Sequence, residues 1–232
     1  MNFDKIINQG YNFNIGKYIS EGFELFRKDI GGFIVATLLA IVMSFIPFCS
    51  LLAIGNFYKI CKKVDEGQSV QVGDIFDFTD FWMYFKLFFL ILFAVIILMI
   101  PIQFTMIPII VAAKDAGENV NVAMIIGGMG IWFLLFILFL FAFTVSLYFV
   151  QPIISLHKIQ SVRQAYSLSW KIAKKNFFMI LIFSIIVGLI SQLGIIVCGI
   201  GILFTIPVGI CIKYISYKDV LTTQNQKAAI HE

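Results

Sequence analysis

Long apolar stretches without a charged residue dominate the pattern of this 232-residue chain. Four stretches lack Asp, Glu, Lys and Arg, and more polar segments separate them: Ile30–Tyr58, Leu87–Ala113, Asn119–His157 and Asn176–Ile212. A helix that crosses the hydrocarbon core of a membrane, ~30 Å thick, needs roughly 20 residues. Each stretch is long enough for at least one such helix. The pattern therefore predicts an all-α bundle embedded in a membrane.

The two middle stretches each predict one long helix. Leu87–Ala113 fits a tilted span. Asn119–His157 is longer than one span requires. We expect its helix to begin near Val122, to bend at Gly127–Gly130, and to continue beyond the lipid after Pro152.

The first and last stretches predict helical hairpins. Asn176–Ile212 would be roughly 55 Å long as a single helix, and it has glycines where a turn would fall: Gly194, Gly199 and Gly201. In Ile30–Tyr58, Pro47 lies near the centre, where it removes a backbone donor and clashes with the preceding turn. One steeply tilted span remains the alternative for this stretch.

The basic residues favour the hairpin. With six spans in three hairpins, only Lys114 among the 17 Lys and Arg falls on the side opposite the N-terminus. A single span over Ile30–Tyr58 would move the Lys59–Lys63 cluster to that side. Because Lys and Arg concentrate in cytoplasmic loops, we expect a multi-pass protein of the bacterial inner membrane with both termini in the cytoplasm.

We expect one polytopic membrane domain. Its segments are a cytoplasmic amphipathic segment (1–29), a first hairpin (30–61), an interfacial helix (72–86), a second hairpin (87–155), an amphipathic helix (158–175), a third hairpin (176–216) and a cytoplasmic tail (217–232). The amphipathic segments before the first and third hairpins have the same apolar spacing. In the first, the apolar face is Ile15, Ile19, Phe23 and Phe26, and in the second it is Val162, Tyr166, Trp170 and Ala173. Duplication and convergence both account for this repeat.

A third amphipathic segment, Val72–Lys86, carries carboxylates at a spacing of three residues. They are Asp74, Asp77 and Asp80, which would share one face of a helix. This face is either a docking surface or cation site, or a solvated face with Asp74 near the helix start, where negative charge is favoured.

Composition agrees with a membrane protein and limits its chemistry. Hydrophobic residues make up 60% of the chain and charged residues 13%, outside the range of soluble domains. The net charge of +4 reflects the positive-inside bias and favours anionic lipid rather than nucleic acid. The cysteines are far apart in sequence, which favours buried small side chains over a disulfide framework or zinc site: Cys49, Cys61, Cys198 and Cys211.

Groups suited to catalysis are sparse. The only histidines are His157 and His231, and no metalloprotease or phosphate-loop motif occurs. We therefore expect no enzymatic activity, no cofactor and no bound metal. Among the polar residues within the apolar stretches, Gln103 and Gln192 stand out because an amide in lipid must find a hydrogen-bond partner. They predict either a polar path through the membrane or hydrogen bonds between helices.

Short motifs resemble a broad bacterial family of uncharacterised polytopic membrane proteins, which is related to the membrane domain fused to some glycerophosphodiester phosphodiesterases. These motifs are Ile46-Pro47…Gly55, Gly67-Gln68, Asp74-Ile75-Phe76-Asp77-Phe78, Tyr148-Phe149-Val150…Pro152, Ala165-Tyr166-Ser167-Leu168-Ser169 and Gly194…Gly199-Ile200-Gly201. The resemblance covers most of the chain and implies an integral membrane protein. It implies no phosphodiesterase activity, because no phosphodiesterase domain is attached.

Two functional hypotheses follow. The first is a non-catalytic membrane protein that acts through membrane lipids or another membrane protein, in envelope assembly or homeostasis. The second is a passive or lipid-directed transporter. The first predicts a centre filled by side chains, and the second predicts a cavity that reaches Gln103 or Gln192.

Overall fold

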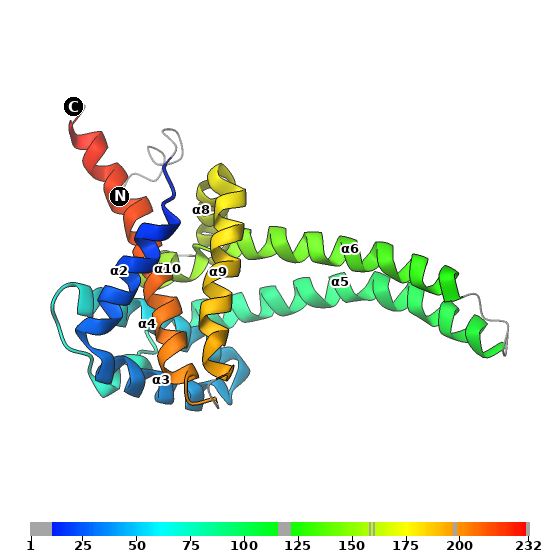
Figure 1. Ribbon diagram of the computed structural model, residues 1–232, viewed down its shortest axis with the longest axis horizontal. Coiled ribbons are helices and arrows are strands. Elements are labelled where there is room, and N and C mark those ends of the chain that lie inside the picture. Colours follow the sequence, from blue (N-terminus) through cyan, green and yellow to red (C-terminus); the bar gives the residue numbers. More distant parts are fainter. Residues whose placement is uncertain (1–10, 116–121, 158, 160, 197–198, 231–232) are drawn as a thin grey trace. The chain divides into compact units, whose positions relative to one another are not determined.

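The computed structural model describes the backbone of residues 11–115, 122–157, 159, 161–196 and 199–230. Side chains at 101–102, 104–106, 108–110, 112–115, 122–129, 131–132, 196 and 222–230 lie outside this description. Every regular element among the described residues is a helix (Figure 1), which confirms the all-α class. The chain divides into two units, which we call the helical body (residues 1–85 and 144–232) and the central hairpin (residues 86–143).

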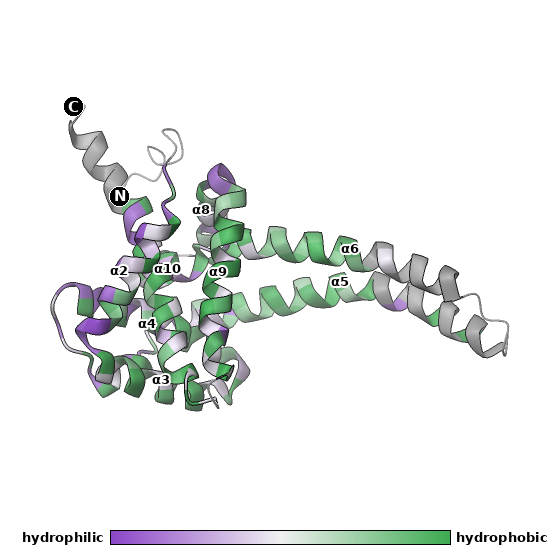
Figure 2. Ribbon diagram, viewed as in Figure 1, coloured by the Kyte–Doolittle hydropathy of each residue, from purple (hydrophilic) through white to green (hydrophobic). Residues whose placement is uncertain are grey.

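The helices of the body are α2 (Ile15–Lys28), α3 (Ile30–Ser44), α4 (Pro47–Asp65), η1 (Val72–Phe76), α7 (Val150–Leu156), α8 (Val162–Ala173), η3 (Lys174–Asn176), α9 (Phe177–Ile196) and α10 (Ile202–Ile230). The central hairpin consists of most of α5 (Phe81–Asp115) and α6 (Val122–Leu147), which run antiparallel in Figure 1. Figure 2 shows hydrophobic residues along both of these helices.

The body is built around α10, which packs against α2, α3, α4 and α9. Small residues let α10 approach α2 and α9 closely. A Cβ added to Gly22 of α2 would lie 2.6 Å from the Cα of Ile212. Gly209 of α10 has no space for a Cβ because the Ser191 side chain fills it. The interior contains large, fully buried side chains such as Tyr58 and Phe183, as a filled core requires.

Three helical stretches are long and apolar enough to cross a membrane: Phe81–Ile100, Phe133–Leu156 and Val162–Ile195. This confirms the coarse prediction of several candidate membrane-spanning helices. The first predicted hairpin is present as two helices, α3 and α4, which pack against each other. The chain turns at Phe45 and Ile46, and Pro47 is the first residue of α4. Pro fits that position because the first helical N–H has no partner within the helix.

α6 begins at Val122, as expected, and its backbone is not broken at Gly127–Gly130, where a bend was predicted. The helix is interrupted instead at Tyr148 and Phe149, between α6 and α7. Pro152 explains this position. A proline ring clashes with the carbonyl four residues earlier, and here that carbonyl belongs to Tyr148.

The single helix predicted for residues 72–86 is also corrected. The structure has a short 3₁₀ helix, η1, then extended backbone at Asp77, and α5 begins at Phe81. The buried Asn56 of α4 donates from Nδ2 to the carbonyls of Ile75 and Asp77 at 2.8 and 2.9 Å. These bonds hold the backbone at Ile75 and Asp77 against α4. We call residues 66–80 the strap.

Two segments of the body repeat each other. α2 and α8 begin at Ile15 and Val162, and α3 and α9 begin at Ile30 and Phe177, so both pairs are separated by 147 residues. We call residues 15–32 the N-terminal elbow and residues 162–179 the C-terminal elbow. Residues buried at matching positions of the elbows are Tyr18 and Ala165, Gly22 and Ser169, Leu25 and Ile172, and Phe26 and Ala173.

The apolar residues predicted to share one face of each elbow are divided between the protein interior and its surface. Phe26, Val162 and Ala173 are buried, but Phe23, Tyr166 and Trp170 are 37–39% exposed. The inward positions are taken instead by smaller residues such as Gly22 and Ser169. Small side chains let helices approach closely in membrane proteins, while aromatic side chains are favoured at the interface. The largest apolar residues therefore need not face the protein interior.

Candidate functional site

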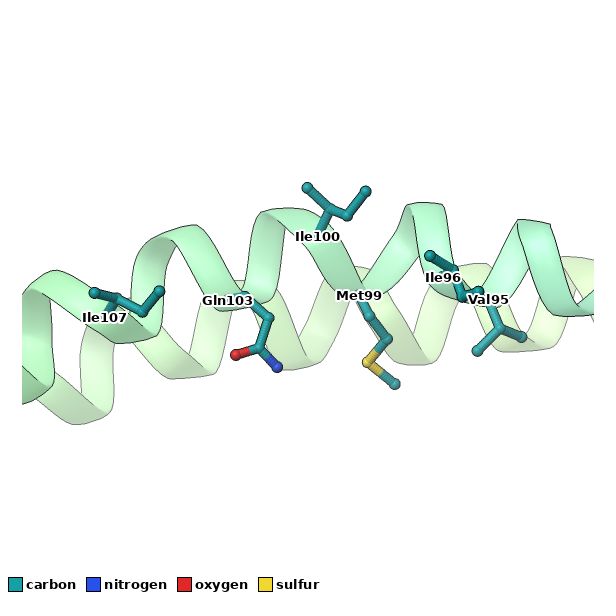
Figure 3. Close-up of a pocket in the computed structure, with 6 residues that line it drawn as sticks. All are labelled: Val95, Ile96, Met99, Ile100, Gln103 and Ile107. Carbon is teal, nitrogen blue, oxygen red and sulfur yellow. The ribbon is translucent and has the colours of Figure 1, made fainter.

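An open groove of about 400 Å³ runs along α5 in the central hairpin (Figure 3). Its described lining residues are Val95, Ile96, Met99, Ile100, Gln103 and Ile107. Their spacing of three and four residues places them along one side of the helix. Gln103 is the one polar member of this set. The groove is therefore an apolar strip that contains one amide.

The Gln103 amide has no hydrogen-bond partner among the described residues, and its side chain is exposed. A primary amide has two donor hydrogens and an acceptor oxygen. The hydrocarbon core supplies no water to satisfy them, so an amide there needs a protein or ligand partner. The groove presents this unsatisfied group to any molecule that lies against it.

Gln192 is also exposed, on α9, but it lines neither the groove at Gln103 nor a smaller groove beside α4. A hydrogen bond between two helices is present at the neighbouring residue, Ser191. Thr205 of α10 donates from Oγ1 to the Ser191 carbonyl of α9 at 2.8 Å. Among the residues that it describes, the structure therefore shows no polar path through the membrane at Gln103 or at Gln192. The groove on α5 does include Gln103 in its lining.

Lysines of α4 hold the three aspartates that were predicted as a docking face. The Lys59 Nζ lies 2.7 Å from Asp77 Oδ2 and 2.5 Å from Asp80 Oδ2. The Lys63 Nζ lies 2.5 Å from Asp74 Oδ1. The carboxylates do not share a helix face, because the strap is not a continuous helix, yet they converge on one side of α4. Their docking role stays a prediction.

Hydrogen bonding keeps Asp77 ionised. Burial by itself would raise the pKa of Asp77, but hydrogen bonds from Lys59 and Thr79 outweigh it and lower the pKa to about 2. Thr79 contributes a backbone N–H at 2.9 Å. The Asp77 carboxylate therefore ties the strap to α4 at neutral pH.

A second groove, of about 300 Å³, lies beside these ion pairs. It is lined by Lys59, Lys62, Lys63, Glu66, Gln68, Ser155 and Leu156. Each of its lysines has an acidic neighbour, since Lys62 Nζ lies 3.9 Å from Glu66 Oε1. Burial, together with the nearby Lys62, lowers the pKa of His157, so this histidine is neutral at neutral pH. The groove carries no excess of positive charge.

The residues predicted as turns lie at helix ends. Pro47 opens α4, and Gly199 adopts a φ of 76° between α9 and α10. Only glycine takes that conformation readily. A Cβ on Gly201 would lie 2.7 Å from the Cα of Gly194, so these two glycines permit the close approach of α9 and α10 at their turn.

Two cysteines that are distant in sequence meet in the core. The sulfur atoms of Cys61 on α4 and Cys211 on α10 are 3.7 Å apart, and both side chains are fully buried free thiols. Sequence spacing gave no sign of this pair, because it depends on the packing of α4 against α10. Among the described residues, no group of three or more His, Cys, Asp and Glu is arranged to bind a metal ion.

Comparison of the chain with protein-family models, with curated proteins and with solved structures finds no match. The resemblance to a membrane family therefore remains an expectation from short motifs. A functional conclusion has to rest on the geometry of the described residues.

Proposed function

We propose that the protein is a non-catalytic, multi-pass protein of the bacterial cytoplasmic membrane that binds another membrane protein through the groove at Gln103. One observation carries this proposal: the exposed Gln103 amide lies within an apolar strip and has no hydrogen-bond partner among the described residues. An amide that faces lipid is unfavourable until it finds a partner. A polar side chain on a neighbouring transmembrane helix supplies one, and such a bond contributes about 0.6–2 kcal/mol.

The membrane arrangement that we propose has six spans in three hairpins with both termini in the cytoplasm. The three long apolar helices support it. α3 has 15 residues and is about 22 Å long, shorter than a typical hydrocarbon core. The α3–α4 hairpin nevertheless returns to the side from which it enters, which keeps the lysines of α4 with the other bases.

Labelling of single engineered cysteines tests this arrangement. A cysteine in place of Glu66 should be accessible only from the cytoplasm, and one in place of Lys114 only from the opposite side. Equal access to both positions from one side would contradict the six-span arrangement, while leaving the groove at Gln103 unaffected.

The carboxylates of the strap and of α4 support a non-catalytic role, because they form ion pairs with lysines of the body. Asp74, Asp77 and Asp80 are engaged by lysines that hold the strap. Asp65 accepts a hydrogen bond from Lys218 at 2.5 Å. General acid–base catalysis needs a titratable group within reach of a substrate, whereas these carboxylates join elements of the body.

The groove also favours the second hypothesis, a lipid-directed role. It is open, and apolar residues supply most of its described lining, which suits an acyl chain. We rank this second because an acyl chain would leave the Gln103 amide unsatisfied.

Photo-crosslinking distinguishes these two roles. A photoreactive residue in place of Ile100, in the groove, should form a specific adduct with one membrane protein in intact cells. The Q103L variant should lose this adduct, and the matched Q192L variant should keep it. A photoreactive residue in place of Ile97, which is exposed on the same helix but does not line the groove, gives the background. Adducts with lipid alone, equal at both positions, would contradict a protein partner and favour the lipid-directed role.

A further inference from the structure

The C-terminal elbow carries positive charge that nothing in the described structure compensates. Its exposed residues include four bases: Arg163, Lys171, Lys174 and Lys175. The sequence has no Asp or Glu between Glu118 and Asp219. None of the four bases has an ion-pair partner within the described part of the chain. By contrast, the lysines of α4 that point to the strap are paired with acids.

Exposed aromatic side chains accompany these bases. Tyr166 and Trp170 are each 37% exposed, and Phe178, at the start of α9, is 75% exposed. Tyr and Trp are enriched where lipid headgroups meet the hydrocarbon. The opposite side of α8 is occupied, because Val162, Ala165 and Ile172 are buried in the body. The elbow therefore has one face that packs in the protein and one that is basic and aromatic.

The position of the elbow relative to α9 places its charges at headgroup depth. α9 has 20 residues and is about 30 Å long, enough to cross the hydrocarbon core. Lys174 and Lys175 immediately precede it. Figure 2 shows this hydrophilic turn between α8 and the hydrophobic α9. When α9 spans the membrane, both ammonium groups lie at the level of the phosphates.

We propose that the C-terminal elbow binds the phosphate headgroups of anionic phospholipids. Lys and Arg near a membrane surface attract anionic lipid, and charge-assisted hydrogen bonds to phosphate oxygens are strong. Trp170 and Tyr166 hold the elbow at the interface while the bases contact the headgroups. This inference rests on the membrane placement proposed above and is independent of the partner at Gln103.

The N-terminal elbow provides a matched control within the same chain. It has two helices at matching positions and four matching buried positions, but its charges are mixed. Its bases are Lys17, Arg27 and Lys28, and its acids are Glu21, Glu24 and Asp29. Lys171 of the C-terminal elbow stands where the N-terminal elbow has Glu24. Arg27 and Lys28 occupy the positions that match Lys174 and Lys175. Removal of two charges from either elbow is therefore an equivalent change.

Quenching of Trp170 fluorescence tests the proposal. The full-length W82F/W132F protein, with Trp170 as its one tryptophan, is reconstituted in phosphatidylcholine vesicles that contain brominated phosphatidylglycerol or brominated phosphatidylcholine. The phosphatidylglycerol should quench more strongly, and high salt should reduce the difference. The K174Q/K175Q variant should lower the preference for phosphatidylglycerol about tenfold at low ionic strength. The R27Q/K28Q variant should change it far less.

Three results would overturn the proposal. Equal quenching by the two brominated lipids would exclude a preference for anionic headgroups. An equal loss in the R27Q/K28Q variant would assign the preference to overall charge rather than to this elbow. If inorganic phosphate, but not chloride of equal ionic strength, abolishes the preference, the ligand is free phosphate rather than lipid. Absence of quenching by both lipids would instead contradict the membrane placement of α9.

Discussion

The two elbows share one architecture and differ in what their charged residues do. Their helices begin 147 residues apart, and four pairs of matching positions are buried in both. The N-terminal elbow has three acids, and the C-terminal elbow has none. Helix packing thus depends on the small and apolar residues of the buried face, while the exposed face is free to take a different charge pattern.

The residue just before α3 and the matching residue just before α9 show the difference most clearly. In the N-terminal elbow, Asp29 accepts hydrogen bonds from the backbone N–H groups of Gly32 at 2.9 Å and Val70 at 2.8 Å. It therefore caps α3 and fixes the strap. In the C-terminal elbow the matching residue is Asn176, which donates from Nδ2 to the Tyr11 carbonyl at 2.8 Å. The acid of the first elbow has a structural role that the second elbow does not need.

The largest expected effect comes from joining the helices that follow the two elbows. Prolonged treatment with a membrane-permeable oxidant should form a disulfide between Cys61 of α4 and Cys211 of α10, because their sulfur atoms are 3.7 Å apart, although burial of both thiols slows the reaction. Because this bond would close a loop of 150 residues, the chain-entropy model gives about 5 kcal/mol of stabilisation. Non-reducing electrophoresis and the midpoint of thermal unfolding in detergent measure the result.

A matched cysteine substitution controls this experiment. The C61S variant should lose the disulfide, and the C49S variant should keep it, because Cys49 is also a buried thiol of α4 but has no described sulfur neighbour. A disulfide that forms equally in C61S would contradict the packing of α4 against α10.

A smaller effect is expected at the buried face of the N-terminal elbow. In the G22A variant the new Cβ would lie 2.6 Å from the Cα of Ile212 and 2.8 Å from its N. Backbone atoms cannot move aside cheaply, so we expect a loss of about 1–3 kcal/mol, measured as a lower unfolding midpoint. The G31A variant, where a Cβ meets nothing within 4 Å, should retain the midpoint. If both variants unfold alike, the contact between α2 and α10 is wrong.

Exchange of the residues that precede α3 and α9 should have a similar or smaller effect. The D29N variant replaces one accepting oxygen by an NH₂ group that faces a backbone N–H, so we expect a loss of about 1–2 kcal/mol. The N176D variant loses the bond to Tyr11 and leaves α3 unchanged. Proteolysis within the strap should accelerate in D29N alone. Equal acceleration in N176D would contradict the link between Asp29 and the strap.

Several features of this fold could be predicted from the sequence because they have a local cause. Pro47 and Gly199 act through the conformations that their own backbones allow. The repeat of the elbows is visible from spacing alone. The inward face was only partly predictable, since aromatic residues such as Trp170 are favoured at the membrane interface as well as in a core. A hydrophobic stripe in a membrane protein does not identify its inward side.

The remaining features depend on contacts between distant residues. The strap is fastened to α4 by Asn56, about twenty positions earlier in the chain, which donates to the carbonyls of Ile75 and Asp77. The Cys61–Cys211 contact requires the packing of α4 and α10. Gln103 was identified from the sequence as an amide in an apolar stretch, but its exposure in a groove required the structure.

Acid should weaken the attachment of the strap and leave the C-terminal elbow unchanged. This is the smallest of the expected effects. The pKa of Asp77 is lowered from 3.8 to about 2, so its contribution to stability is present above pH 3.8 and is lost as the pH falls through 2. The contribution should be below about 1 kcal/mol, because the ion pair is partly exposed and screened. The C-terminal elbow has no acid to titrate in this range.

Single-tryptophan proteins separate these responses. Trp82 lies just after the strap, and Trp170 lies in the C-terminal elbow. On acidification to about pH 2, the emission of the Trp82 protein should shift, because protonation of Asp77 weakens its bond to Lys59 and loosens the strap. The Trp170 protein should not shift over the same range. The D77N substitution should reduce the Trp82 shift, since it removes one of the three strap carboxylates that pair with lysines of α4. A Trp170 shift as large as that of Trp82 would mean that acid unfolds the whole body rather than releasing the strap.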